Sequence, residues 1–230
     1  MRPRRRIAVL LLLAACSLAP AQVVDRMVAV VNRRVILESE LDQAVRVEFL
    51  MQGKPLASLT QADRAAVLER LIERSLLDQQ IIHPDMLDPT PQELAAKVKE
   101  LRDGMPGPPA AADQQWQALL HSYGLTGQDL EEQLASQVRI LRFIDLRFRG
   151  LVHVDKNDVE IYYQEKFLPE VRKRNAPEPA LAEVSGRIEQ VLVEQRIDDL
   201  LNNWLKTLRA QAHIEKMLRA APAPAGGALP

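Results

Sequence analysis

The stretch Gln22–Asp42 reads QVVDRMVAVVNRRVILESELD, and within it the period of the hydrophobic residues changes from two, typical of strands, to that of a helix. Two short runs rich in β-branched residues, Val28–Val31 and Val35–Leu37, are typical of strands. Asn32 opens the tight connection between them, and asparagine tolerates the left-handed conformation that such a turn needs. From Glu38 onward the apolar spacing is helical, with acidic residues in the first turn, where they favour the helix dipole. We therefore expect a small β element that leads directly into a helix.

Cap residues mark the starts of the helices that follow. Thr60, Thr90, Thr126 and Asp155 each precede an apolar stripe of helical period. The first three have an acidic residue three positions on, which predicts a capping box. A further, very long helix begins near Leu181. The helices expected after the first one span about residues 60–82, 90–102, 113–123, 126–149, 155–167 and 181–218, with a short strand at 152–154.

The chain is therefore expected to be mostly α-helical, with one small N-terminal β element and a long C-terminal helix that packs back on the rest. Pro169, Pro177 and Pro179 bracket a charged segment that predicts a linker over residues 169–180. The tail over residues 220–230 consists of alanine, proline, glycine and one leucine, a composition that predicts disorder.

The N-terminus has the pattern of an export signal. Four arginines within Met1–Arg6 precede the apolar run Ile7–Leu13, which is too short to span a bilayer. Two processing sites stand as alternatives: cleavage before Gln22 after a small-x-small sequence, or a lipobox that ends at Cys16 and makes it a lipidated first residue. Cleavage before Gln22 leaves 209 residues with 26 basic and 31 acidic groups, a net charge of −5. With either alternative the mature protein is expected to leave the cytoplasm, soluble or lipid-anchored.

Composition excludes several classes of function. The full chain has 30 basic and 31 acidic side chains, whereas a nucleic-acid binder usually has a strongly basic face. Its four histidines are each 30 or more residues from the next, so no zinc-binding spacing exists, and one cysteine makes neither an internal disulfide nor a thiolate metal cluster. Gly-rich phosphate loops and nucleophile elbows are absent as well. We expect no cofactor, no metal and no nucleic-acid partner.

The remaining groups of charged and aromatic residues indicate no catalytic site. The carboxylates of Glu38, Glu40 and Asp42 read as the acidic first turn of a solvated helix. His153 lies between two valines, as strand-edge histidines do, and Tyr162-Tyr163 predicts one ring in the core and one at its rim. The arginines of the 126–149 helix form a basic C-terminal end suited to the helix dipole, to anionic lipid or to an acidic partner: Arg139, Arg142, Arg147 and Arg149. These residues alone indicate an exported helical binding module whose client-binding residues are unknown.

The stretch Gln22–Asp42 closely resembles the start of SurA-type periplasmic chaperones, in which a short β element runs into an acidic helix start. Later segments resemble the same family more loosely and extend the likeness over most of residues 22–167: Leu68–Ile82, Thr90–Glu93, Asp129–Arg149 and Val154–Tyr163.

The chain departs from the family after the helix expected over residues 155–167, which contains Tyr162 and Tyr163. SurA-type proteins carry one or two parvulin-type prolyl isomerase domains there, each of about a hundred residues in the family. Here only Leu168–Ala180 lies before the terminal helix, which is too short for such a domain. The expected organisation is a signal peptide, a SurA N-terminal-like chaperone region, a Pro-rich linker in place of the parvulin domain, a terminal helix that completes the same domain, and a tail: residues 1–21, 22–168, 169–180, 181–219 and 220–230.

The resemblance implies an ATP-independent holdase that binds unfolded or extended polypeptides, outer-membrane proteins above all, and lowers the concentration of aggregation-prone chains by mass action. It does not extend to prolyl isomerase activity, because the catalytic domain is missing. Two alternatives remain: a subunit or lipoprotein that grips one dedicated envelope partner, and, disfavoured, a prolyl isomerase. The long terminal helix also suits a homodimer formed by helix exchange.

Overall fold

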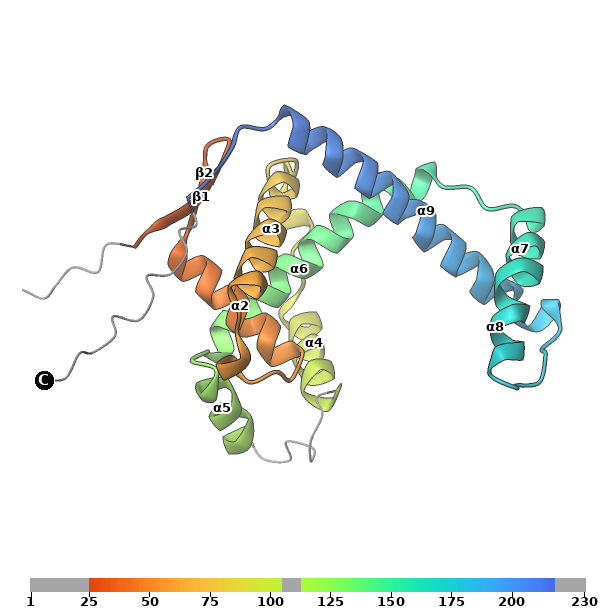
Figure 1. The fold of residues 1–230 in the computed structure, drawn as a ribbon, viewed down its shortest axis with the longest axis horizontal. Coiled ribbons are helices and arrows are strands. Elements are labelled where there is room, and N and C mark those ends of the chain that lie inside the picture. The colour runs from red at the N-terminus through yellow and green to blue at the C-terminus, as the bar shows by residue number, and fades with distance from the viewer. Residues whose placement is uncertain (1–24, 105–112, 218–230) are drawn as a thin grey trace, which may run out of the picture.

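The computed structural model describes residues 25–104 and 113–217 (Figure 1). Most of these residues are helical, and a small sheet joins the two ends of the described chain. The strands are β1 (Met27–Val31), β2 (Arg34–Leu37) and β3 (Ile214–Lys216). The helices are α2 (Glu38–Met51), α3 (Gln61–Asp78), α4 (Pro91–Gly104), α5 (Asp113–Ser122), α6 (Gly127–Phe148), α7 (Lys156–Tyr162), α8 (Leu168–Lys173) and α9 (Leu181–Gln211). The predicted fold class is confirmed, whereas the tail, the signal segment and Cys16 lie outside the described residues.

The hairpin of β1 and β2 forms as expected. Asn32 adopts a φ of 57°, in the left-handed region, and the two strands pair antiparallel with Val30 opposite Val35. One face of the hairpin packs against the core, and its residues Ala29, Val31 and Ile36 are fully buried. Glu38 starts α2 immediately after β2, so the hairpin fixes the direction in which the first helix leaves the sheet.

The third strand is a correction to the prediction that a helix continues to residue 218. The helix ends at Gln211, and β3 pairs antiparallel with β1 to give the order β2-β1-β3. Asn32 directs this pairing, because its backbone N–H donates to the carbonyl of His213 at 2.7 Å and its side-chain oxygen accepts from the His213 N–H at 2.9 Å. The partner of β3 lies more than 180 residues away in the chain, so local period does not reveal it.

Capping boxes start the helices at the predicted residues. The hydroxyls of Thr60 and Thr126 accept from the backbone N–H three residues on, and the aspartate there accepts from the cap's own N–H. Thr90 makes the same reciprocal pair with Glu93, and Asp155 caps α7. Each box satisfies backbone donors that the first turn leaves unpaired, which explains why local sequence predicts these boundaries well.

Two adjoining core clusters make up the main body. Strands β1 and β2 pack on α2 and α3, and a second cluster joins α2 to α4, α5 and α6. The end of α9 and strand β3 complete the first cluster through Leu208, Ala212 and Ile214. Glu69 of α3 secures this closure, since it forms ion pairs with Arg209 of α9 and Lys216 of β3.

A small satellite lies at the other end of α9, where α7, a π-helical segment (η4, Tyr163–Phe167) and α8 pack on the first turns of the long helix (Figure 1). Tyr163 is buried there and Tyr162 is half-buried, which confirms the prediction for this pair. The Tyr163 hydroxyl donates to the carbonyl of Pro179 at 2.7 Å. Helix α9 thus extends from the satellite, across α6, to the sheet.

Two further expectations differ from the structure near the satellite. Residues 152–154 form no strand and are an extended connection, in which the carbonyl of His153 accepts from Arg196 of α9. Helical structure also continues through α8 to Lys173, so only residues 174–180 of the predicted linker are non-helical. Pro169 is the second residue of α8, directly after the π-helical segment Tyr163–Phe167, and the helical run continues through it.

Candidate functional site: an apolar groove between α6 and α9

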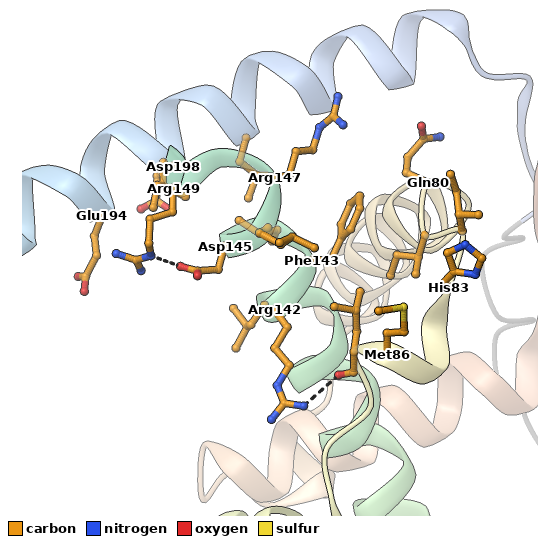
Figure 2. Close-up of a pocket in the computed structure, with 18 residues that line it drawn as sticks. Gln80, His83, Met86, Arg142, Phe143, Asp145, Arg147, Arg149, Glu194 and Asp198 are labelled. Atoms are coloured by element: carbon orange, nitrogen blue, oxygen red, sulfur yellow. Dashed lines mark hydrogen bonds and ion pairs between the residues drawn. The ribbon is translucent and has the colours of Figure 1, made fainter. Parts of the chain in front are cut away.

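An open cavity of about 1090 Å³ lies where α9 crosses the C-terminal half of α6, beside the segment that follows α3 (Figure 2). We call it the α6–α9 groove. Its apolar lining comes from three places: Ile81, Ile82, Met86 and Leu87 after α3, Leu141, Phe143, Ile144 and Leu146 of α6, and Ile197 and Leu201 of α9.

The segment after α3 enters the groove because α3 ends earlier than its apolar pattern predicts. The prediction runs to about Ile82, but the helix stops at Asp78. Gln79 holds this end by donating to the carbonyl of Val31 at 3.3 Å and accepting from the side chain of Asn32 at 2.8 Å. The chain therefore turns away before Ile82, which is left 84% exposed at the groove.

Arginines of α6 hold the same segment from the other side. Arg139 forms an ion pair with Asp88, and Arg142 donates to the carbonyl of Asp88 at 2.9 Å and pairs with Glu93. Hydrogen bonds from the backbone and hydroxyl of Thr90, and then Arg142, keep the pKa of the Glu93 carboxyl below its usual value. The basic end of α6 predicted from sequence is thus partly used inside the fold.

The wall of α9 is fixed to α6 by an aromatic cluster around Trp204. The Trp204 ring lies 5.9 Å from Phe143 and 5.6 Å from Phe148, and the Arg147 guanidinium lies 4.1 Å from the indole centroid. Phe148 is buried and Trp204 is half-buried. Such ring pairs and cation–π contacts are directional, so they set the distance between the two helices that bound the groove.

The groove leaves several large apolar side chains in water. Met86 is 80% exposed, Leu146 76% and Leu141 57%, in addition to Ile82. Soluble proteins expose single apolar residues routinely, but a contiguous apolar patch marks a binding surface. The unbranched, polarizable side chain of Met86 adapts to ligands of different shape. The sequence does not reveal this groove, because it joins parts of α6 and α9 to the segment after α3, and local patterns do not show which segments meet.

A second cavity of about 410 Å³ lies between α2, α3, α6 and α9, lined by apolar residues such as Val47, Val67 and Ile140. Leu141 and Leu201 line both cavities, so the apolar surface continues from the groove toward the main core.

The other residues singled out in the sequence form no second site. Glu38, Glu40 and Asp42 form ion pairs with Arg26, Arg34 and Arg64 around the start of α2. His153 is exposed on the connection before α7. Within residues 25–104 and 113–217, no group of three or more His, Cys, Asp or Glu side chains is placed to hold a metal ion, and no helix is apolar and long enough to cross a bilayer.

Comparison with known proteins gives a relative for part of the chain. It is 34% identical over 155 residues to Chaperone SurA of Pseudomonas aeruginosa (strain PAO1), a match that covers 63% of this chain and 34% of that protein. No family model matches the sequence. The chain spans about a third of the length of the relative that it matches, and its sequence is SurA-like over that part.

Proposed function

We propose that this chain is an ATP-independent periplasmic chaperone, a holdase that binds unfolded outer-membrane or other exported proteins. The observation that carries the proposal is the α6–α9 groove, where Ile82, Met86 and Leu146 are each more than three-quarters exposed. Full burial of one such side chain by a bound partner stabilises the complex by about 1.5–3 kcal/mol. Within the described residues, no other part of the chain covers these side chains. The similarity to Chaperone SurA supports the same role.

The size and shape of the groove favour a polypeptide client. Sites for small molecules usually enclose about 300–1,000 Å³ and bury most of the ligand. The groove lies at the upper end of that range and is open to solvent, so an extended segment can lie in it while the rest of the client remains outside. Contacts with apolar side chains are tolerant of sequence, as a binder of many unfolded chains requires.

The proposal includes the organisation expected from sequence: export through residues 1–21, a chaperone region completed by the terminal helix, and no isomerase domain inserted before that helix. The short non-helical connection over residues 174–180 between α8 and α9 supports the last point. A proline-peptide isomerisation assay on the purified chain should then show no acceleration over the uncatalysed rate.

Suppression of aggregation tests the function. Purified residues 22–230, without nucleotide, should keep an unfolded outer-membrane β-barrel protein soluble at equimolar or lower concentration. Leu146→Ser should weaken this activity several-fold, whereas Leu151→Ser should not, because Leu151 is 70% exposed but does not line the groove. Unchanged aggregation in the presence of the folded wild-type chain would refute general chaperoning and favour one dedicated envelope partner, to be sought by pull-down from periplasm.

A further inference from the structure

The rim of the α6–α9 groove carries charges of both signs, but the cations are already engaged. Arg142 and Arg149 are held in ion pairs, and Arg147 lies over the Trp204 ring. The anions differ. Among the residues that the structure describes, the side chains of Glu194 and Asp198 have no ion-pair or hydrogen-bond partner, whereas Asp145 on the opposite wall pairs with Arg149.

These two carboxylates belong to the apolar wall of α9. They are four residues apart and hence on one face of the helix, and Ile197 and Leu201 of the same helix line the groove with them. Figure 2 shows both side chains at one end of the groove. Like charges at this spacing repel each other, and a cation placed between them relieves the repulsion.

We propose that the groove prefers extended apolar segments that carry a lysine or arginine next to the apolar residues, with that cation bound by Glu194 and Asp198. The proposal rests on the proposed chaperone function and names the chemistry of its client. The apolar side chains of the client pack against Ile82, Met86 and Leu146, and the two carboxylates fix the register of the segment by charge complementarity.

The preference has a limited size because both carboxylates are exposed. An exposed ion pair contributes little by itself, so two such contacts should tighten binding about threefold to tenfold at low ionic strength. Salt screens charges at a groove open to water, so the preference should shrink as ionic strength rises, whereas the apolar contribution should not.

Two labelled 12-residue peptides test the proposal. Both carry the same alternating Phe, Leu and Ser residues and the same fluorophore, and they differ in having two lysines or two glutamates at one end. Fluorescence anisotropy with residues 22–230 should show tighter binding of the lysine peptide at low salt. Glu194→Gln with Asp198→Asn should abolish the difference, whereas Glu189→Gln with Asp199→Asn should retain it. The control pair removes the same charge from exposed positions of α9 outside the groove.

The outcomes separate the two proposals. Equal affinity for both peptides, with binding that Leu146→Ser weakens, would overturn the charge preference and leave the chaperone function standing. If the control variant also loses the preference for the lysine peptide, the preference arises from the net negative charge of the protein and not from Glu194 and Asp198. That result would overturn the proposed cation site. Failure to bind either peptide would overturn both proposals. A dimer in light scattering that Leu146→Ser converts to a monomer would make the groove a contact between copies of the chain, and would overturn the client preference.

Discussion

Truncation of Trp204 should loosen the junction on which the groove depends. The ring lies against Phe143 and Phe148, and it carries the guanidinium of Arg147 on its face. Each aromatic pair contributes about 0.5–1.5 kcal/mol beyond area burial, and an exposed cation–π contact about 0.5–1 kcal/mol. Truncation of a fully buried aromatic residue typically costs about 3–5 kcal/mol with such contacts included, and the cost should be somewhat smaller here because Trp204 is half-buried. We expect a loss of about 2–4 kcal/mol.

Urea denaturation followed by circular dichroism measures this loss as a shift of the midpoint at constant slope. Trp204→Phe is the matched variant, because it keeps a ring beside Phe143 and Phe148 and should recover about half of the stability. Client binding should weaken with Trp204→Ala even at concentrations of urea where the chain is fully folded. A loss below about 1 kcal/mol, or identical stability of the Ala and Phe variants, would show that ring packing at this junction does not hold α9 to α6.

Three further predictions concern the scaffold. Thr126→Ala should reduce stability by about 1 kcal/mol in urea denaturation and Thr126→Ser much less, because serine keeps the capping hydroxyl. Asn32→Ala should lose about 1–2 kcal/mol, since alanine disfavours a left-handed φ and cannot bond to the β3 end, and Asn32→Gly should lose less; equal losses would contradict this. Burial tends to raise the pKa of Glu69, but hydrogen bonds from Lys216 and Arg209 outweigh it and place the pKa below its ordinary 4.5. Its stabilising contribution should therefore be complete above about pH 5 and fade as pH falls through the lowered pKa, and Glu69→Gln should flatten that part of the pH–stability curve.

Features set by neighbouring residues could be predicted from sequence. Thr60, Thr90 and Thr126 each bond within three residues of themselves, so the starts of their helices follow from a local pattern. The left-handed Asn32 is local in the same sense. The sequence also predicts one buried ring in the Tyr162-Tyr163 pair, but only the structure shows that it is Tyr163.

Features set by distant residues could not be predicted. Strand β3 has three residues and pairs with β1, and α3 ends where Gln79 bonds to the hairpin rather than where its apolar stripe ends. The groove poses the same difficulty, because Leu141 belongs to the apolar stripe of α6 and still remains exposed. The path of α9 across α6 determines which part of that stripe is covered, and local sequence does not reveal this path.

Site-specific photo-crosslinking would show whether clients bind in the α6–α9 groove. A benzophenone side chain is placed at position 82 or 146, in the groove, or at position 151 or 161, where apolar residues are exposed outside it. Each variant is mixed with an unfolded outer-membrane β-barrel protein, without nucleotide, and irradiated. We expect strong crosslinks from positions 82 and 146 and weak ones from 151 and 161. Equal crosslinking from all four positions, or crosslinks only outside the groove, would contradict this expectation.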